Sequence, residues 1–463
     1  MRVYVLGGGL AGLSAAYQLT KDGVETIVVE ALDQVGGLAQ SFTEKGYTYD
    51  LGPHRFHSSD KELNKHFVNV LNGEVEEKIR KSRILLEGRF FEYPLKVGNA
   101  IFNMPLHTMV KIIIDYLTIK VKNALSTSSD SNFEDWVVNR FGWKLYEIYF
   151  KVYTEKTWGM PCTQISADWA AQRITLLSLW DTVMKTLFKS GDTPRTYVSK
   201  FNYPKKGGIG GLSNAYVKSI KKSGGKVITS SPVKKIHLKG SKISSIDYEG
   251  GSVKIAKNDL VFSTIPLTDF VRFTTPSAPK NVLSSAKKLK FRAIVFVTLF
   301  LEKEHASDDH WIYLPQQMFT SNRLSESKNF NVKNTPHGKT CLTFEITCQV
   351  GDKVWNEKDE KLAETALDDA VKTGLVEKSQ FIGASVHRME HGYPIYDLEY
   401  KKHMADVIGY MKSIGNLRFF GRNGLYRYNN MDHSVSMGLT AAKSVSDKNM
   451  QYLKVATEQK WFG

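Results

Sequence analysis

Three glycines near the start of the chain have the spacing of a dinucleotide-binding turn. In Gly7, Gly9 and Gly12 (G-x-G-x-x-G), the first glycine allows a tight turn and the second lets the backbone approach a pyrophosphate. The third lets a helix pack closely on a strand. Glu30 stands at the distance at which an acidic side chain binds a ribose. These residues predict a dinucleotide site, in which the N-terminus of a helix points at the phosphates.

The flanking residues predict the elements that would position this site. Residues 2–6 and 25–29 are short apolar runs typical of buried strands, and residues 13–19 have helical periodicity. Glycine-rich turns also occur in ordinary loops. Here the order of strand, glycines, helix, strand and acid favours a cofactor site.

A second glycine pair extends the pattern. Gly36, Gly37 and then Ser41 would let the chain run close along an extended cofactor. The stretch resembles the flavin-binding N-terminus of the superfamily that contains monoamine oxidases, protoporphyrinogen oxidases and UDP-galactopyranose mutases. That resemblance implies FAD, and its motifs are most similar to the mutase-like branch.

The resemblance spans nearly the whole chain and implies an α/β fold. The expected parts are a discontinuous Rossmann-like FAD-binding domain of the GR2 type, a mainly helical insertion and a mixed-sheet substrate domain. The expected boundaries are 1–62, 203–272 and 415–450 for the FAD domain, 63–202 for the insertion, 273–414 for the substrate domain and 451–463 for a tail.

The composition restricts the classes of partner. The 463 residues suggest two or three domains, and 63 basic against 47 acidic residues leave a net charge of +16. This excess favours anionic small molecules, whereas the dispersed lysines argue against nucleic acid. Residues 109–124 predict an amphipathic helix that packs on the core or contacts a membrane surface. The sequence leaves open whether the chain forms a homodimer.

The cysteines and the apolar runs bear on location. Three cysteines are too few and too scattered for a disulfide framework or a zinc site, so no metal is expected. No signal peptide and no transmembrane run is expected. A cytoplasmic location fits these expectations.

A loop after the first unit carries two histidines. Taken alone, His54 and His57 are most simply loop histidines bonded to the backbone. The run Gly-x-His-x-Phe-His is similar to the loop beside the flavin in the mutases. This resemblance implies that His54 contacts the cofactor and that His57, a catalytic candidate, lies against the flavin.

The stretch 153–159 resembles a mutase segment whose aromatic pair holds the uridine base. The matching residues are Tyr153 and Trp158, for which core packing is the alternative. The mutases then carry two arginines four residues apart, the second of which binds the substrate's diphosphate. This chain has Arg173 at the first position and Leu177 at the second, so a phosphate clamp is lost.

Further matches lie in the second half of the chain. After a glycine-rich loop at 207–211, Val233 matches the backbone position at the adenine end of the cofactor. Arg323 matches the mutase arginine that contacts both flavin and substrate. Tyr393 lies in a run that resembles a substrate-tyrosine loop.

The last motif follows a strand near residue 419. Arg422 matches a mutase arginine that contacts the flavin and belongs to the active site, and Met431 matches a cofactor contact. Tyr426 and Tyr428 match substrate tyrosines. Asn430 stands where the mutases have an acid. The helix that begins near residue 432 directs its N-terminus at the flavin.

Two functional classes follow from the resemblance. In the mutases the reduced flavin N5 attacks the anomeric carbon, and a nucleotide sugar is isomerised without net redox change, in cell-surface polysaccharide biosynthesis. The alternative is a net-redox oxidoreductase of the amine oxidase or protoporphyrinogen oxidase type, which Leu177 and Asn430 favour. The mutase-like isomerase is our preferred hypothesis, with Arg323 and Arg422 stabilising negative charge and Tyr393 and Tyr428 holding phosphate oxygens.

Overall fold

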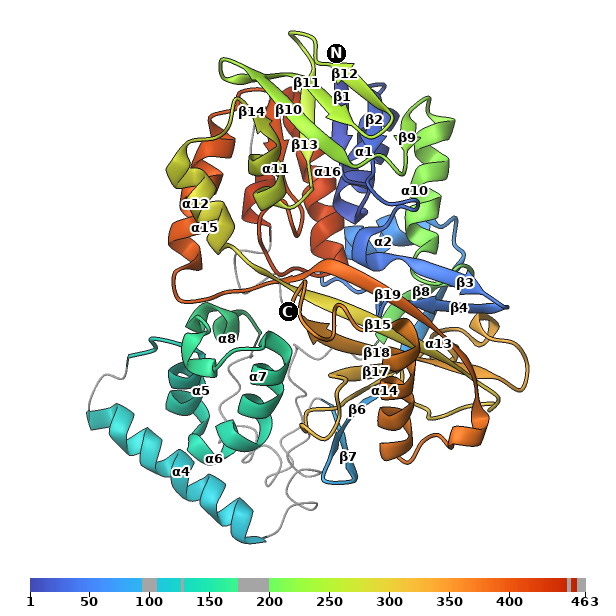
Figure 1. Ribbon diagram of the computed structural model, residues 1–463, viewed down its shortest axis with the longest axis vertical. Helices are drawn as coiled ribbons and strands as arrows, with labels where there is room; N and C mark the ends of the chain where they lie inside the picture. Colours follow the sequence, from blue (N-terminus) through green and yellow to red (C-terminus); the bar gives the residue numbers. More distant parts are fainter. Residues whose placement is uncertain (94–105, 126–128, 174–199, 448–450, 456–463) are drawn as a thin grey trace.

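The computed structural model describes residues 1–93, 106–125, 129–173, 200–447 and 451–455. The chain forms an upper part around a parallel sheet, a lower part around a mixed sheet, and a helical group beside the lower part (Figure 1). The first two parts meet along the long strands β15 and β19, which cross the middle of the molecule.

The parallel sheet begins with the first two strands of the chain and is completed by strands from distant parts of the sequence. Its strand order is β20-β13-β1-β2-β9, and every neighbouring pair is parallel. The bounds are β1 Arg2–Leu6, β2 Glu25–Val29, β9 Lys226–Ile228, β13 Leu260–Ser263 and β20 Leu417–Phe419. The predicted first strand-helix-strand unit is therefore present, with its first strand at the centre of the sheet.

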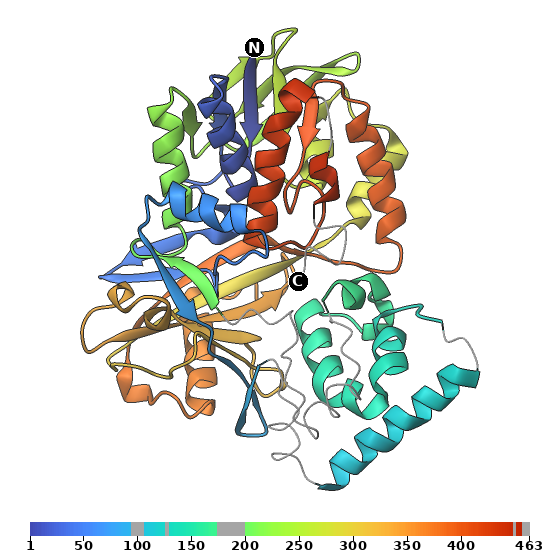
Figure 2. The same ribbon diagram turned by 180° about the vertical axis from the view of Figure 1, so that it is seen from behind.

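Helices cover this sheet. Helix α1 (Leu10–Lys21) packs against α16 (Met431–Asp447), and the two lie side by side in both ribbon views (Figure 2). Helix α10 (Gly211–Lys222) packs on α1 from the other side. The remaining elements of the upper part are α2 Lys61–Val70, β10 Val233–Lys239, β11 Lys242–Tyr248, β12 Gly251–Lys254, α11 Leu267–Phe273, β14 Thr274–Thr275, α12 Lys280–Lys288 and α15 Tyr400–Lys412.

The mixed sheet has seven strands in the order β19-β15-β18-β17-β16-β6-β7. Their bounds are β6 Ser82–Leu86, β7 Arg89–Glu92, β15 Phe291–Leu301, β16 Trp311–Tyr313, β17 Arg323–Glu326, β18 Thr340–Cys348 and β19 Phe381–Pro394. Strands β6 and β7 lie within the range of the mainly helical insertion; β6 joins this sheet by pairing with β16, and β7 pairs with β6. The domain boundaries given above stay a prediction.

The two faces of the mixed sheet differ in chemistry. Alternate residues of a strand point to opposite faces, and Phe344 and Ile346 of β18 belong to the apolar cluster that includes α14 (Asp359–Lys372). Glu345 lies between them and points to the other face, toward the parallel-sheet part. A charged side chain is thereby placed between the two sheets.

The helical group has its own core. It contains α4 Leu106–Leu125, α5 Phe133–Phe141, α6 Trp143–Leu145, α7 Val152–Trp158 and α8 Ala167–Arg173, with residues 146–151 in a wider helical turn. Buried aromatic residues such as Trp136, Tyr146 and Trp158 hold it together. The remaining strands form two small sheets, β3 Ser41–Glu44 with β4 Tyr47–Asp50, and β5 Val75–Ile79 with β8 Lys200–Pro204. Within the described ranges, no helix is both long and apolar enough to cross a membrane.

Candidate active site

The turn after β1 leaves open space over the start of α1. A Cβ atom built on Gly9 would meet no atom within 4 Å, whereas one on Gly12 would lie 2.1 Å from the Gly7 carbonyl oxygen. Gly7 itself has a φ of +101°, which favours glycine. No side chain caps α1. The first-turn N–H groups are therefore free of side-chain caps, as a pyrophosphate site requires.

Glu30 lies at the end of β2 beside this turn. Its carboxylate accepts hydrogen bonds from the Gly8 N–H (2.5 Å) and the Leu32 N–H (2.9 Å). Burial raises the pKa of Glu30, although these bonds act in the opposite direction. The Glu30 carbonyl accepts the Ser231 N–H, which brings the strand that starts at Val233 to the same place. The arrangement fits an adenosine, with a buried acceptor for the ribose.

Gly36 and Gly37 also lie at the turn. Gly36 donates its N–H to the Gly8 carbonyl (2.8 Å), and a Cβ on Gly37 would lie 3.5 Å from the Gly9 Cα. The second glycine pair thus runs directly beside the first glycine motif. This contact supports the prediction that both stretches follow one extended cofactor.

Ser41 holds a second glycine-rich loop in place. Its hydroxyl donates to Asp50 Oδ1 (2.5 Å) and accepts the Gly210 N–H (2.7 Å). Asp50 also accepts the Tyr203 hydroxyl (2.7 Å) and the Ile209 N–H (3.1 Å), and burial raises its pKa to about 6. Ser41 therefore acts through the loop 207–211, which it fixes beside the cofactor side of the sheet.

The predicted histidines lie where the two sheets meet. Burial lowers the pKa of His54 to about 3, and the charges of Arg323 and Arg422 act in the same direction, so His54 is neutral. Burial also lowers the pKa of His57, which the charge of Asp432 opposes. The loop thus brings residues from the parallel-sheet part close to Arg323 of the mixed sheet.

Several buried polar atoms in this region have no hydrogen-bond partner in the described structure, and three of them come from residues of the predicted site or their neighbours. These three are His54 Nδ1, Arg422 Nε and Asp432 Oδ1, from the histidine loop, the segment after β20 and the start of α16. Buried polar atoms are normally bonded. Unpaired donors and acceptors here fit a polar ring system bound between these segments, next to Met431, the first residue of α16.

Arg323 is held by a buried carboxylate. It lies directly opposite Glu345 in the β17–β18 register, and its Nε and Nη2 donate to the two Glu345 oxygens at 2.7 and 2.8 Å. Burial alone would lower the pKa of Arg323, but Glu345 outweighs it and the pKa is raised. Gly52 lies against this pair, since a Cβ there would be 2.6 Å from Glu345 Oε1. The guanidinium is therefore fixed and permanently charged.

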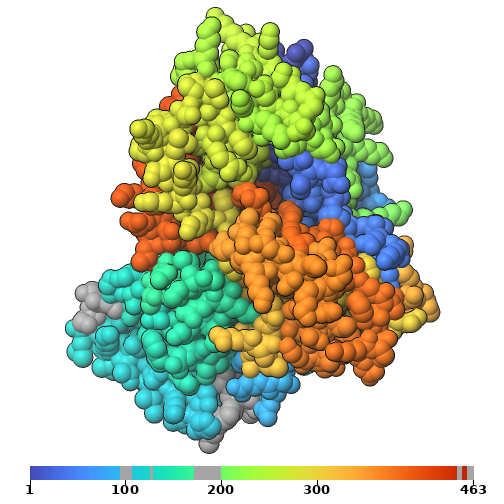
Figure 3. All heavy atoms as spheres, viewed as in Figure 1, coloured from blue at the N-terminus to red at the C-terminus, as the bar shows by residue number. Residues whose placement is uncertain are grey.

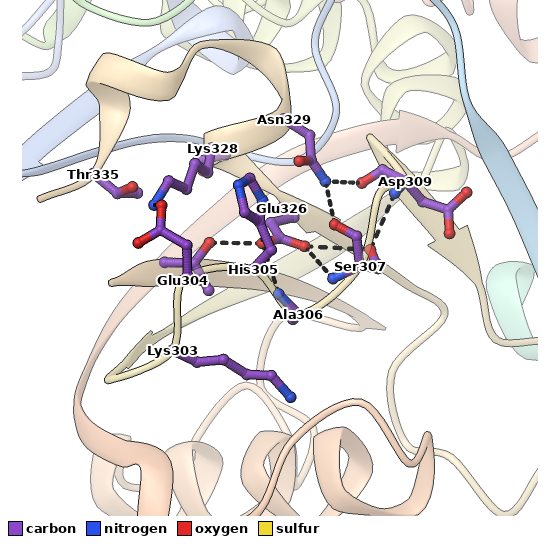
Figure 4. A network of polar contacts seen from close by, with 12 residues as sticks. Lys303, Glu304, His305, Ala306, Ser307, Asp309, Glu326, Lys328, Asn329 and Thr335 are labelled. Carbon is purple, nitrogen blue, oxygen red and sulfur yellow. Dashed lines mark hydrogen bonds and ion pairs between the residues drawn. The ribbon is translucent and has the colours of Figure 1, made fainter. Parts of the chain in front are cut away.

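The far end of β17 is fixed by a separate polar network, shown in Figure 4. Glu326 accepts hydrogen bonds from the Ala306 N–H (2.9 Å), the Ser307 N–H (2.8 Å) and the Thr340 hydroxyl (2.8 Å). This buried carboxylate ties the loop after β15 to the strand that carries Arg323. We assign the network a structural role.

Arg422 is oriented by the main chain and by aromatic rings. Two of its N–H groups donate to the carbonyls of Asn429 (2.7 Å) and Gly392 (2.8 Å). Its Cζ lies 4.3 Å from the centroid of Tyr428 and 5.3 Å from that of Tyr393, within cation–π range. Its charge thereby stays beside two of the predicted substrate tyrosines.

Those tyrosines belong to an aromatic group that the sequence predicted only in part. We define the aromatic group as Trp158, Trp169, Tyr393 and Tyr428. Tyr393 and Tyr428 are stacked at 5.4 Å, Trp158 meets Tyr393 at 6.0 Å, and Trp169 meets Trp158 at 4.7 Å and Tyr428 at 4.8 Å. Residues from α7, α8, β19 and the segment before α16 thus form one surface suited to stacking.

Tyr153 lies on the Arg323 side of the site and does not pair with Trp158. Its ring meets Tyr313 edge-on at 5.8 Å, and the Arg323 Cζ lies 5.8 Å from the same Tyr313 ring. Burial raises the pKa of Tyr153. The two residues of the predicted base-binding pair therefore contact different partners: Tyr153 contacts Tyr313, and Trp158 contacts Tyr393.

Three other motif residues have different outcomes. Tyr426 is buried, and its hydroxyl donates to the carbonyls of Lys290 and Ile395, so the structure gives it a supporting position instead of the expected substrate contact. Arg173 is the last residue of α8, and Leu177 lies outside the described residues. Asn430 is exposed just before α16.

Four site residues escaped the sequence analysis. Glu345 had a signal, a single acid within an apolar strand, and Arg55 stood inside a motif that was read for its histidines. Trp169 and Tyr313 had none, because aromatic residues are frequent in cores. In the part of the chain that is described, no group of histidine, cysteine or acidic residues could hold a metal ion.

Comparisons with known proteins agree with this geometry. The family model described as flavin containing amine oxidoreductase matches residues 10–380. A probable UDP-galactopyranose mutase of Klebsiella pneumoniae is 27% identical over 178 residues, which cover 36% of this chain and less than half (43%) of that protein.

Two solved structures share the fold over almost the whole chain. A reduced UDP-galactopyranose mutase superposes with a TM-score of 0.86 at 21% identity, covering 99% of this chain and 97% of the other. A putrescine oxidase bound to putrescine superposes with a TM-score of 0.65 at 16% identity, covering 96% and 98%. At these identities the likeness shows the fold.

Proposed function

The chain belongs to the flavin-containing amine oxidoreductase family and uses FAD, and from this premise we propose that it is a mutase-like isomerase of a nucleotide sugar. The matched model covers most of the chain, and the fold of the family is the one described above. The finer assignment rests on the arrangement of charges and rings around the histidine loop.

One observation carries the proposal. Two fixed guanidinium groups, Arg323 and Arg422, lie near enough to the buried His54 for their charges to lower its pKa, and Arg422 lies against Tyr428 and Tyr393 of the aromatic group. Cations and stacking rings at one site are the contacts that a nucleotide diphosphate requires. The similarity to mutases, in sequence and in fold, supports the same substrate class.

The residues of the chain would bind and orient the substrate. FAD, when bound, supplies the bond-forming and redox chemistry that no side chain of the site offers. Arg323, held by Glu345, and Arg422, held by two carbonyls, would stabilise the negative charge that develops on the leaving diphosphate. His54 stays neutral and adds no charge. Trp158 would pack against the base, and Tyr393 and Tyr428 would exclude water and hold phosphate oxygens.

A net-redox oxidoreductase is the second candidate, and two observations favour it. The Nη groups of Arg422 donate to main-chain carbonyls, which limits its grip on a phosphate. Asn430 replaces the acid of the mutases, and Leu177 replaces an arginine. An amine or a porphyrinogen-type molecule would then be the substrate.

Product analysis distinguishes the two candidates. We expect FAD-loaded protein, reduced with dithionite, to convert UDP-galactopyranose or another nucleotide sugar into a ring isomer that chromatography separates. The oxidised protein should be inactive in the same assay. Hydrogen peroxide formed in stoichiometric amounts with an amine, and no isomer from any nucleotide sugar, would establish the redox alternative.

A further inference from the structure

A second pair of arginines lies near the candidate site, at residues that the motifs did not single out. The Cζ of Arg55 lies 4.6 Å from the centroid of the Trp311 ring, and the Cζ of Arg80 lies 5.6 Å from the same centroid. Trp311 is only 1% exposed. Arg55 belongs to the histidine loop, so its position is set by the segment that carries His54 and His57.

Arg55 has no counter-charge among the described residues. Arg83, on the neighbouring strand, pairs with Asp309 at 2.6 Å, and Arg323 pairs with Glu345. For Arg55 the described chain offers neither a carboxylate nor a hydrogen-bond acceptor, only the Trp311 ring. Burial lowers the pKa of Arg55 to about 10, and the charge of Arg80 acts in the same direction. A bound anion would offset both the burial of the Arg55 charge and its repulsion by Arg80.

The arginine pair lies on the Arg323 side of the site. Arg80 donates to the Tyr93 carbonyl at 2.7 Å, and the Tyr93 ring meets Tyr313 at 4.8 Å. Tyr313 in turn lies 5.8 Å from the Arg323 Cζ. A continuous row of rings and guanidinium groups thus leads from Trp311 to Arg323.

We propose that Arg55, with Arg80 beside it, binds a phosphate group of the substrate. A guanidinium offers two parallel N–H donors to a phosphate, and the Trp311 ring orients that of Arg55. The proposal rests on the proposed function and deepens it. It gives the diphosphate a cation in place of the arginine that is absent at Leu177.

Binding measurements test this role without any need for turnover. UDP and inorganic pyrophosphate are titrated into the full, FAD-loaded chain, and calorimetry or the change in flavin absorbance gives Kd. Arg55→Met is expected to raise both Kd values at least about tenfold, and Arg55→Lys at least about threefold, because lysine keeps the charge and loses the paired donors. Arg2→Met, which removes an exposed guanidinium at the start of β1, is the matched control and should bind as wild type.

The outcomes separate the two proposals. An Arg55→Met protein that keeps its FAD and binds UDP and pyrophosphate within twofold of wild type would overturn the role of Arg55, whether or not an isomer is formed. A tenfold loss without any isomerase activity in wild type would support the phosphate site and reject the mutase. If Arg55→Met fails to hold FAD, the test uses Arg55→Lys instead. Unchanged Kd values of that variant for UDP and pyrophosphate would overturn the proposal.

An independent feature lies on α4, at the outer edge of the helical group (Figure 3). Six aliphatic side chains at helical spacing are 46–83% exposed: Val110, Ile113, Ile114, Leu117, Val121 and Leu125. The opposite side of the helix is buried at Ile112 and Tyr116, and Asp115 accepts the Lys144 N–H there. The outward stripe is therefore not the core-packing face of this helix.

The charges on α4 indicate what covers the stripe. At about 100° per residue, Lys111 and Lys122 border it on one side and Lys120 on the other. Asp115, the helix's single acid, is turned inward. Apolar residues flanked by lysines, on a chain with a net charge of +16, complement an anionic lipid surface. We infer that α4 docks on such a surface.

Vesicle binding tests this inference. FAD-loaded protein should sediment with phosphatidylcholine vesicles containing about one third phosphatidylglycerol, and much less with phosphatidylcholine alone. Ile114→Glu with Leu117→Glu is expected to reduce binding at least about tenfold, whereas Val332→Glu with Ile382→Glu, exposed apolar positions elsewhere, should bind as wild type. Equal vesicle binding by the α4 variant and the wild type would overturn the lipid assignment. So would a wild-type protein that is dimeric while the α4 variant is monomeric.

Discussion

Substitution of Gly9 by alanine separates the cofactor role of the glycine turn from its role in folding. Gly9 has φ −71° and ψ 173°, which alanine adopts without strain, and its added methyl group would meet no protein atom within 4 Å. The apo protein should therefore gain about 0.4–1 kcal/mol of stability, because alanine restricts the unfolded chain. The same methyl group would occupy the space over α1 in which we expect the pyrophosphate to bind. Overlap of this kind costs about 1–3 kcal/mol, or roughly 5- to 150-fold in the Kd of FAD.

The assay has two readouts and two matched controls. FAD is titrated into apo protein by fluorescence quenching, and thermal unfolding of the apo protein is recorded alongside. Gly409→Ala, in α15, also has open space and should stabilise the protein without changing FAD affinity. Gly12→Ala should impair both readouts, because its Cβ would lie 2.1 Å from the Gly7 oxygen. A Gly9→Ala protein that binds FAD as tightly as wild type would refute the placement of the pyrophosphate.

Three further predictions concern charged groups of the site. Arg323→Ala is expected to retain FAD and to lose at least about a hundredfold in turnover, and unchanged turnover would discard its catalytic role. Glu345→Leu should lower the free energy of unfolding by about 3 kcal/mol in urea denaturation, because it leaves Arg323 charged and largely buried, whereas no loss would show that the pair is dispensable. Burial raises the folded-state pKa of Asp50 from 3.8 to about 6, so its contribution to stability is full below 3.8 and is lost as the pH rises through about 6. Asp50→Asn should remove this dependence, so that the wild-type Tm falls relative to that of the variant between about pH 4 and 7; parallel Tm profiles would contradict it.

The parts of the fold that local chemistry determines could be predicted from the sequence. Strands 2–6 and 25–29 and the helix over 109–124 are present because each has a strong local pattern. The pairing of β6 with β16 could not be foreseen, since short strands carry no mark of their partners and this contact joins residues more than 200 positions apart. Sheet order depends on such long-range packing.

The candidate site shows the same division. Gly9 lies in the turn after β1 and Glu30 directly after β2, as the local pattern predicted, while the roles of Gly9, Glu30 and Arg323 toward cofactor and substrate stay predictions. The partners that fix them, such as Glu345 for Arg323, come from segments without a motif, because a supporting residue needs only position and charge. Tyr426 shows the converse, since a residue inside a motif ties down the backbone through its hydroxyl.

The central claim is that the polypeptide orients an anionic sugar nucleotide while the flavin undergoes no net redox change. Its most direct test is to follow the flavin absorbance of anaerobically reduced protein during incubation with UDP-galactopyranose, and to analyse the products of the same sample. We predict that a ring isomer accumulates over many turnovers while the flavin stays reduced. Flavin reoxidation in proportion to the substrate consumed, or no isomer at all, would contradict the claim.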